Sequence, residues 1–422
     1  MLAPTGILAP HNARKWTRRD ATHILWRAQF GASSAEINRA QKDGLAQTLA
    51  RLLGPQPESA EFTTVEPLLR QTAIDTGAIG DLQAWWLYRM HHSANPFPEK
   101  LTLFWHNHFA TSAAKVRSVP AMVVQNDLLR RECLGSFRQM LHGMAKDGAM
   151  LIWLDGNANR KRHANENFAR EVMELFSLGE GNYTEADIKQ AARAFTGWHV
   201  RLEKFWFNAR QHDNTDKSLF GKTGNLDGGE VLDLCLAHKA CPRFLAFKLL
   251  RAFVLDQPAE AQVAALSARI HGHDFEMAPV MRELFSSKLF FSAEARHAII
   301  KSPLELVLGA CRALEVRPNL QAVNRVTGQL GQSIFAPPTV KGWEGGRLWI
   351  NSASLLQRNN FAMALLQGRF GEVTALKDGL AHYRELLLAR EAPELEKFKG
   401  NGNDEKRRLV HLTMTLPEFQ LT

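Results

Sequence analysis

The sequence has few cysteines and no long apolar run, and these absences exclude several classes of protein. Four cysteines in 422 residues, Cys133, Cys235, Cys241 and Cys311, are too few for a disulfide scaffold and form no CxxC pair. A structural zinc site on thiolates is therefore not expected, and we predict buried thiols instead. No apolar run approaches the roughly 20 residues that a helix needs to cross a bilayer.

The first residues of the chain lack the features of an export signal. Residues 1–20 contain no basic segment that leads into an apolar one, and Arg18 and Arg19 precede Asp20 rather than a hydrophobic stretch. On this observation alone, a cytoplasmic location is favoured.

Two common motifs of nucleotide-binding proteins and hydrolases are also missing. The segment GKTG, residues 221–224, is not part of a GxxxxGK[ST] phosphate-binding loop. No GxSxG nucleophile elbow occurs, so a standard serine hydrolase has little support.

Charge of one sign is not concentrated along the chain. The 52 basic residues exceed the 43 acidic ones and give a net charge of +9, which is compatible with an anionic partner. Nucleic-acid-binding proteins usually gather such charge on one face or arm. The densest basic clusters here, residues 159–163 and 405–408, are short and are surrounded by acidic residues. Nucleic acid is therefore not expected as a partner.

What the sequence does contain is helical periodicity over most of its length. Apolar residues make up 45% of the chain and charged residues 23%, which is typical of a soluble globular protein. Alternating strand patterns are few. We predict an all-α fold, with an N-terminal segment over residues 1–19 and a single large multi-helix domain over residues 20–422. Helices are predicted over residues 20–31 (capped by Asp20 and ended by Gly31), 33–53 with a short break, 79–94, 98–112, 119–146, 165–178, 184–197, 229–256, 259–271, 277–287, 293–298 and 302–315.

Long loops rich in glycine and proline separate some of these helices. Residues 54–67 are predicted to form a surface loop, and residues 221–230 and 336–349 are too long for simple turns. Long ordered loops on a helical scaffold are common places for functional residues.

Residues 163–187 contain six acidic side chains, most of which have a local explanation. Asn165 is predicted to cap a helix. Arg170 lies four residues from Glu166 and from Glu174, a spacing that allows helical ion pairs. Thr184 and Asp187 have the spacing of a capping box for the next helix.

Glu171 and Glu174 have no such complete explanation. They lie three residues apart on the flank of a core-facing helix. Two carboxylates at this spacing can share a metal ion or a substrate hydroxyl, or they can simply be solvated. The spacing alone does not decide between these alternatives.

Several segments carry a resemblance to a known family. They include the motifs WHNHF, NENFAREVMELFSLGEGNYTEADI, TGW, HDxxxK and PPxxxGW, in the order that they have in this chain. In order and spacing the sequence resembles a large bacterial family of domains of unknown function, over nearly its whole length.

The resemblance implies a helical fold but no established activity. It implies that relatives are often exported, in contrast to the missing leader of this chain, and that they are often encoded beside a sulfatase-like protein, which is therefore an expected partner. It also draws attention to His106, His108, Arg170, Glu171 and Glu174, which lie in the shared motifs.

His106 and His108 are both candidates for metal binding, but helical geometry opposes a shared ion. In a helix over residues 98–112 the two side chains point about 200° apart. His108 falls on the face that carries Leu101 and Trp105. We expect it to be hydrogen-bonded to a carboxylate or carbonyl, with a role as ligand or base as the alternative.

His212 and Asp213 follow an aromatic segment outside the predicted helices. A loop could direct this imidazole and carboxylate into a cleft, where they could act in acid–base catalysis or hold a divalent metal ion. A chance pairing of the two residue types is the alternative. Lys217 belongs to the same shared motif and is a candidate ligand-binding residue.

Three tryptophans are candidates for an aromatic binding surface. Trp343 and Trp349 lie in a glycine-rich loop, and Trp198 follows a predicted helix. Such rings can contact a sugar or polymer, or they can fix a long loop to the core.

Two hypotheses for function follow. The first is a hydrolase acting on a polar or polymeric substrate, with Glu171, Glu174 and either His108 or His212 as the reacting groups. The second is a non-catalytic scaffold or binding protein that partners the sulfatase-like protein. For the acid–base candidate, we predict that the helix over residues 165–178 packs against the helix over residues 98–112. This packing would bring Glu171 or Glu174 within hydrogen-bonding range of His108, with Arg170 balancing the surplus charge, because the carboxylate and the histidine are each costly to bury alone.

Overall fold

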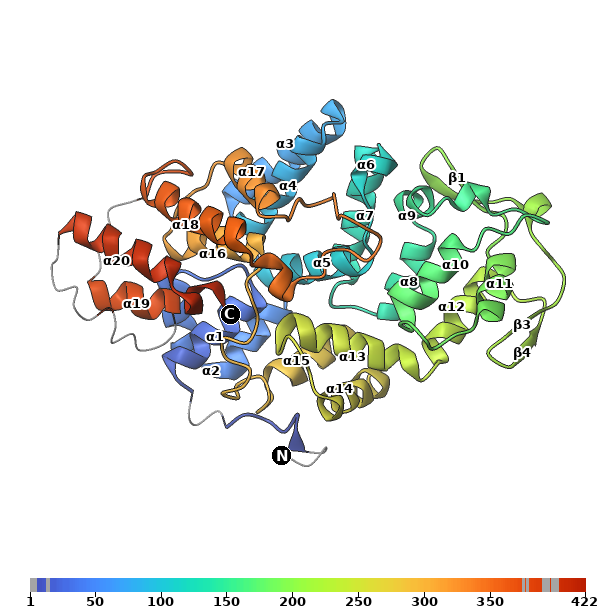
Figure 1. Ribbon diagram of the computed structural model, residues 1–422, viewed down its shortest axis with the longest axis horizontal. Helices are drawn as coiled ribbons and strands as arrows, with labels where there is room; N and C mark the ends of the chain where they lie inside the picture. The colour runs from blue at the N-terminus through green and yellow to red at the C-terminus, as the bar shows by residue number, and fades with distance from the viewer. Residues whose placement is uncertain (1–5, 13–15, 374–375, 377–378, 389–394, 396–401) are drawn as a thin grey trace.

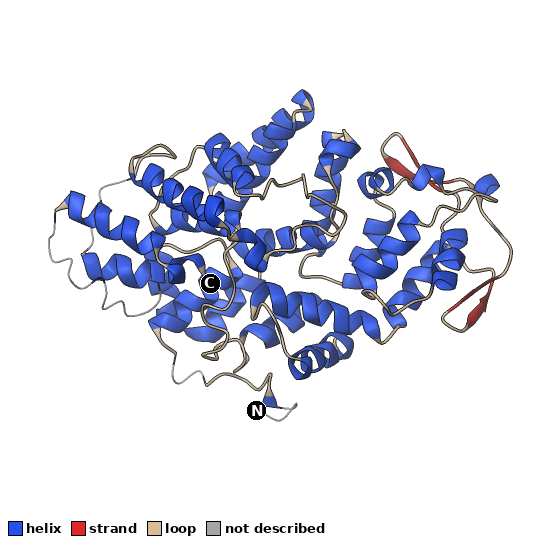
Figure 2. Ribbon diagram, in the orientation of Figure 1, coloured by secondary structure: helices blue, strands red, loops and turns tan. Residues whose placement is uncertain are grey.

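The structure, a computed structural model, describes residues 6–12, 16–373, 376, 379–388, 395 and 402–422. Helices dominate this part of the chain, which also contains two small antiparallel sheets (Figures 1 and 2). The helical prediction is confirmed in this coarse form, and the strands are an addition to it. The boundary between residues 1–19 and 20–422 stays a prediction.

The helices and strands have the following bounds. The α-helices are α1 (Arg18–Ala28), α2 (Ser34–Leu53), α3 (Ala60–Thr76), α4 (Ile79–His92), α5 (Pro96–His108), α6 (Ala113–Val116), α7 (Val119–Glu132), α8 (Phe137–Ala145), α9 (Gly148–Trp153), α10 (Asn167–Glu171), α11 (Glu185–Ala194), α12 (Gly228–Ala237), α13 (Ala240–Phe253), α14 (Glu260–Gly272), α15 (Met277–Phe285), α16 (Pro303–Ala313), α17 (Leu320–Gln329), α18 (Ser352–Leu366), α19 (Leu380–Leu388) and α20 (Asn403–Thr415). The strands are β1 (Trp198–Arg201), β2 (Lys204–Phe207), β3 (Lys217–Leu219) and β4 (Lys222–Gly224).

Several helix boundaries differ from the prediction for identifiable reasons. Thr17, not Asp20, caps α1, because the Asp20 carboxylate reaches back to the Thr17 backbone N–H in a capping box. The predicted break in α2 is confirmed at Gly44, whose φ of 77° interrupts the helix. The loop predicted over residues 54–67 is wrong in its second half, because Ser59 caps α3 there.

Other predicted ranges are divided or lost. Residues 119–146 form α7 and α8, and residues 229–256 form α12 and α13. Residues 293–298 form turns rather than a helix. Helices α17 to α20 lie in the part of the chain for which no helix was predicted.

Helix α5 lies in the middle of the molecule and is almost completely buried. It packs against α1, α2, α4 and α7 (Figure 1). Its buried residues include three polar or charged ones besides its histidines: Glu99, Lys100 and Thr102. Because unpaired buried charges are costly, each charged residue here has an ionic partner. Glu99 binds Arg89 and Arg130, and Lys100 pairs with Glu305.

Both hairpins lie at one end of the molecule. Strands β1 and β2 form one hairpin and β3 and β4 the other, and Figure 2 shows both far from α19 and α20. Among the described residues, no helix is long and apolar enough to span a membrane.

Candidate functional site

A cleft of about 270 Å³ lies between α5, α13 and the loop that joins α17 to α18. In Figure 1 this loop, drawn in orange, runs across α5. The cleft also reaches residues 299–302 and the first turns of α16. Its lining contains five aromatic side chains, Phe104, Phe247, Phe253, Trp343 and Trp349, and four basic ones, Lys100, Lys248, Arg251 and Lys341. Asn107, His108 and the carboxylates of Asp256, Glu305 and Glu344 also line it.

One wall of the cleft is fixed by a clamp between Asn107 and Trp343. The Asn107 side chain accepts from the Trp343 backbone N–H at 2.6 Å and donates to the Trp343 carbonyl at 3.0 Å. Gly342 allows this approach, because a Cβ there would lie 2.2 Å from Asn107 Oδ1. The glycine also adopts a φ of 78°, which favours a residue without a side chain. The predicted loop over residues 336–349 is thus pinned to α5 at one point.

The floor of the cleft contains His108 and Lys248 side by side. His108 Nε2 lies 3.0 Å from the Phe176 carbonyl, and Lys248 Nζ lies 3.3 Å from His108 Nδ1. A carbonyl only accepts, so Nε2 carries the proton and Nδ1 accepts from Lys248. The expected hydrogen bond between His108 and Glu171 or Glu174 is therefore wrong, and the carbonyl alternative is confirmed. Phe176 lies near the end of its helix, where carbonyls lack a helical partner.

Lys248 differs from the other basic groups of the cleft. In the described part of the chain no ion pair joins it to a carboxylate, whereas Arg251 pairs with Asp256 at 3.7 Å and Lys341 with Glu180 at 2.9 Å. Burial, helped by the nearby charge of Arg251, lowers the pKa of Lys248 to about 8. Burial and Lys248 together hold the pKa of His108 well below its ordinary value, so this ring is neutral near pH 7.

His106 points to the other side of α5, as the helical geometry predicts. Its Nε2 accepts from the Phe335 backbone N–H at 3.2 Å, and its ring contacts Trp86 and Trp343. Burial lowers its pKa to about 3. The two histidines therefore contact different segments, His106 the one at Phe335 and His108 the one at Phe176, and they point away from each other.

Glu171 and Glu174 lie beside the cleft rather than on its floor. Glu174 accepts from the Tyr183 hydroxyl at 2.7 Å and lies 3.8 Å from Lys341, which lines the cleft. Burial and the charge of Glu174 raise the pKa of Glu171. Lys341 thus links the carboxylates to the cleft. Residues Val172–Ser177 form a π-helical segment, a feature often found at functional sites.

Arg170 balances two carboxylates, but not the predicted set. It pairs with Glu166 at 3.3 Å, as its spacing predicts, and with Glu185 at 2.8 Å in place of Glu174. The helix cap is also different, because the Asn165 side chain accepts from Asn167 while Glu166 occupies the cap position. The capping box of Thr184 and Asp187 is confirmed.

His212, Asp213 and Lys217 lie outside the cleft and hold the segments around the hairpins. His212 is buried, with Nδ1 2.8 Å from the Thr196 carbonyl. Asp213 accepts from Arg193 at 2.8 Å, and this guanidinium with the Thr215 hydrogen bonds holds the pKa of Asp213 well below its usual range despite burial. Lys217, also buried, donates to the Thr215 carbonyl at 3.0 Å.

Of the three candidate tryptophans, two lie at the cleft and one lies outside it. Trp343 and Trp349 line the cleft, whereas Trp198 is buried between Phe195 and Phe205. Gly228 packs directly on the Trp198 ring, where a Cβ would come within 2.5 Å. Trp198 therefore fixes β1 to the helical core.

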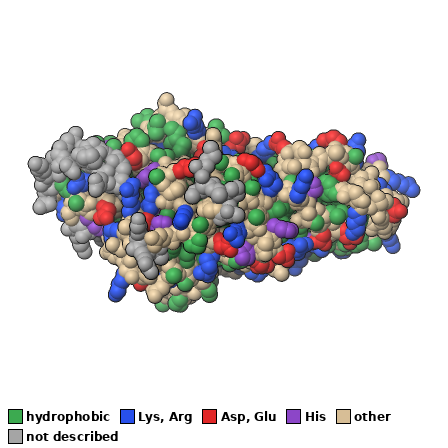
Figure 3. Space-filling view, turned by 90° about the horizontal axis from the view of Figure 1, so that it is seen from below, with side chains coloured by type: hydrophobic (Ala, Val, Ile, Leu, Met, Phe, Trp, Pro, Cys, Tyr) green, Lys and Arg blue, Asp and Glu red, His purple; other side chains and the backbone are tan. Residues whose placement is uncertain are grey.

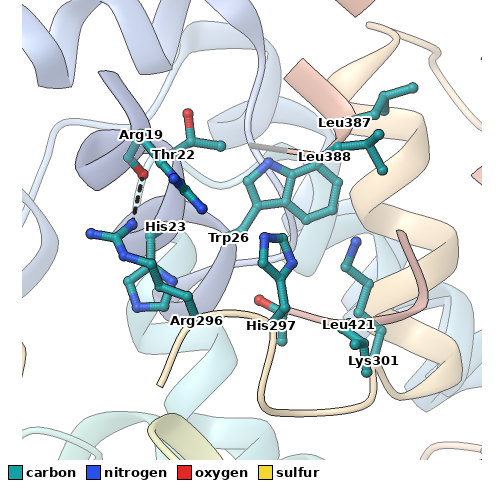
Figure 4. Close-up of a pocket in the computed structure, with 11 residues that line it drawn as sticks. Arg19, Thr22, His23, Trp26, Arg296, His297, Lys301, Leu387, Leu388 and Leu421 are labelled. Carbon is teal, nitrogen blue, oxygen red and sulfur yellow. Dashed lines mark hydrogen bonds between the residues drawn. The ribbon is translucent and has the colours of Figure 1, made fainter. Parts of the chain in front are cut away.

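A second cavity is too small for an organic ligand. It has a volume of about 30 Å³, room for little more than a water molecule, and Figure 4 shows Trp26, His297 and Lys301 along its wall. Lys301 Nζ donates to the Phe419 carbonyl and lies 4.0 Å from the centre of the Trp26 ring. We interpret this cavity as part of the core. The described residues also contain no group of three or more His, Cys, Asp or Glu side chains placed to hold a metal ion.

Comparison with known proteins identifies the family. The family model described as protein of unknown function (DUF1800) matches residues 23–421. The chain belongs to the DUF1800 family. No curated protein and no solved structure matches it. The resemblance noted in the sequence is thereby confirmed at the level of a family of unknown function.

The most informative residues of this DUF1800 cleft were missed in the sequence. Lys248 lies in a helix with an ordinary amphipathic pattern, and nothing local marks it. Asn107 lies between the two histidines of the WHNHF motif, so its place in a shared motif could have drawn attention to it.

Proposed function

We propose that this DUF1800 protein binds a small anionic ligand in the cleft between α5, α13 and the loop before α18. The observation that supports this proposal is Lys248, a cleft-lining ammonium whose hydrogen-bond partner is the neutral His108 rather than a carboxylate. Burial of an ammonium without a counter-charge is costly, and an anion bound beside it would remove that cost.

The other walls restrict the shape of the ligand. Phe104, Phe247, Trp343 and Trp349 give the cleft aromatic surfaces, and Trp343 is held in place by Asn107. Flat or ring-shaped groups pack well on such surfaces. The favoured ligand is therefore an anion that carries a ring, such as a phosphorylated or sulfated sugar or an aromatic acid.

Substitution of Lys248 tests this proposal directly. We expect Lys248→Met to lower the affinity for phenyl phosphate at least about tenfold, because a charge-assisted hydrogen bond contributes about 1.5–3 kcal/mol. Titration calorimetry of the wild type, Lys248→Met and the exposed-surface control Lys42→Met measures this. Equal affinities of all three proteins, or no binding to the wild type, would contradict an anion site at Lys248.

The pH dependence of binding gives a second test. Lys248 has a pKa of about 8, so it is largely charged at pH 7 and loses its proton as the pH rises through 8. We expect the affinity for phenyl phosphate to fall above pH 8 and to approach that of Lys248→Met by pH 10. An affinity that is constant between pH 7 and 10 would show that another cation holds the anion.

A second candidate function, a hydrolase that acts on a polar or polymeric substrate, is supported by Glu171. A carboxyl group with a raised pKa next to a second carboxylate is the arrangement that divides acid and base roles in many hydrolases. Lys341 would place these groups at the rim of the cleft. The partnership with a sulfatase-like protein stays a prediction, and an anion-binding cleft is chemically compatible with it.

Variants of the two carboxylates separate a reactive role from a structural one. At pH 7 the charge on Glu171 is unfavourable, so Glu171→Gln should leave the thermal midpoint unchanged or slightly raised. Glu174→Gln weakens contacts with Tyr183 and Lys341, so it should lower the free energy of unfolding by less than about 1 kcal/mol and the thermal midpoint only slightly. A large loss of stability in Glu171→Gln would show that Glu171 belongs to a structural network.

A further inference from the structure

The β1–β2 hairpin ends in a turn that presents a leucine to solvent. Leu202 and Glu203 form the turn, with φ values of 50° and 61°, and 87% of Leu202 is exposed. Two-residue turns with positive φ at both positions favour Asn-Gly, because a Cβ makes the left-handed conformation costly. Leu202 has this conformational cost, and because its side chain is exposed, no burial of apolar surface offsets it. Packing within the described chain therefore does not explain a leucine at this position.

The turn is held by rigid contacts at its base. The Glu203 carbonyl lies directly against Gly148 at the start of α9, where a Cβ would come within 1.9 Å. The Val200 backbone N–H donates to the Asn157 side chain at 2.7 Å. These contacts fix the backbone on both sides of the tip. Leu202 is thus projected from a well-supported turn.

One face of the hairpin combines like charges with an aromatic ring. Arg201 lies directly opposite Lys204 in the strand register, and His199 lies opposite Trp206. Like charges at facing positions destabilise a two-stranded sheet. Trp206 is 42% exposed, and Phe207 on the other face is 45% exposed. A nearby anion would relieve the repulsion between Arg201 and Lys204.

A basic loop extends this surface. Arg160, Lys161 and Arg162 are exposed, and the Lys161 backbone N–H donates to the Gln211 carbonyl at 2.7 Å, beside the exposed Arg210. His199 joins this loop to β1 through the Asn159 carbonyl. These four cations, with Arg201 and Lys204, make no ion pair with a carboxylate in the part of the chain that the structure describes. Figure 3 views the molecule from below and shows both basic and acidic side chains, blue and red, at the end that carries the hairpins.

We propose that this surface, formed by residues 199–207 with the loop 160–162 and Arg210, binds an anionic lipid membrane. An exposed leucine and aromatic rings at a projecting tip, surrounded by cations, have the composition of segments that lie at the boundary between headgroups and acyl chains. Glu203 is the one acidic side chain within residues 199–207. A nucleic acid or an acidic polysaccharide would use the cations and Trp206, but it would gain little from the aliphatic Leu202.

A fluorescent label at the tip tests insertion. The four native cysteines are buried, so Leu202→Cys provides a single reactive thiol for an environment-sensitive dye, and Leu68→Cys at a site that is 63% exposed on α3 is the matched control. With vesicles of phosphatidylcholine and about one-third phosphatidylglycerol, we expect a blue shift for the label at 202 alone. Pure phosphatidylcholine vesicles should give no shift. Equal signals from both labels, or none from either, would overturn the proposal.

Substitutions at the same surface separate lipid from other polyanions. We expect Leu202→Ser and the double variant Arg201→Glu/Lys204→Glu each to lower co-sedimentation with the anionic vesicles, the double variant at least about tenfold, since each cation near such a surface contributes about a factor of five. Leu68→Ser should have no effect, and all variants should keep the wild-type thermal midpoint. A different result would show a polyanion site instead. In that result the wild type binds single-stranded DNA or dextran sulfate but not the vesicles, the Arg201→Glu/Lys204→Glu variant loses this binding, and Leu202→Ser keeps it.

Discussion

Replacement of Glu99 by glutamine is expected to destabilise the protein by about 3 kcal/mol, because it removes a buried counter-charge that two arginines share. Glu99 is buried and accepts from Arg89 at 2.9 Å, from Arg130 at 2.8 Å and from the Trp86 indole at 3.0 Å. The change keeps the volume of the side chain, and it leaves Arg89 with Glu66 and Arg130 with Asp127 as their remaining carboxylate partners. The midpoint of urea unfolding at pH 7 measures the effect.

The pH dependence of this effect has a defined direction. Burial alone raises the pKa of Glu99, but Arg130 and Arg89 outweigh it and hold the pKa below its ordinary value. The stabilisation by Glu99 is therefore fully present above the unfolded-state pKa of about 4.3 and is lost as the pH falls through the lower folded-state pKa. The difference in the free energy of unfolding between the wild type and Glu99→Gln should therefore become smaller as the pH falls through the folded-state pKa of Glu99.

Glu61 provides the control for Glu99. It pairs with Arg317 at the surface, so Glu61→Gln should change stability by less than about 1 kcal/mol. If the two variants lose similar amounts of stability, the buried network around Glu99 does not hold α4, α5 and α7 together.

Local patterns in the sequence predicted the parts of the fold that depend on local physics. The capping box at Thr184, the break in α2 at Gly44 and the pair of Glu166 with Arg170 are all confirmed. Each depends on residues within four positions of one another. The opposite orientation of His106 and His108 follows from helical geometry in the same way.

Partners that lie far apart in the chain could not be predicted from these patterns. His108 satisfies its two nitrogens with Phe176, 68 residues away, and Lys248, 140 residues away. A carboxylate was an equally good partner on energetic grounds, and only the tertiary arrangement selects the carbonyl. Lys248 was missed for the same reason, because its position beside His108 depends on how α13 packs.

The hairpins were missed because their strands are too short for a strand pattern. Strands β1 and β2 have four residues each, and on one face the buried Trp198 packs against Phe195 of the helical core and against the half-buried Phe205. Over residues 54–67 the error was the reverse, because a loop was predicted where part of a helix lies. The composition of this segment is typical of a loop, yet α3 begins within it, with Ser59 as the cap and Pro67 inside the helix.

Replacement of Gly342 by alanine is expected to displace the aromatic wall of the cleft. The left-handed conformation of this residue costs a side chain about 1–2 kcal/mol, and overpacking against Asn107 adds about 1–3 kcal/mol. The atoms in the way are Oδ1 and the backbone carbonyl of Asn107, at 2.2 and 2.6 Å from the new Cβ. Since α5 is buried on most sides, the loop rather than the helix should move and carry Trp343 with it.

Gly77→Ala separates the clash from the conformational cost. Gly77 is left-handed, with a φ of 63°, but no atom lies within 4 Å of its added Cβ. We expect Gly342→Ala to lower the thermal midpoint further than Gly77→Ala. Because Lys248 lies on α13, Gly342→Ala should keep its affinity for inorganic phosphate and lose the additional affinity for phenyl phosphate that Trp343 provides. Equal loss of both affinities would mean that the loop positions Lys248 as well as the ring, and unchanged affinity for phenyl phosphate would exclude Trp343 from the binding wall.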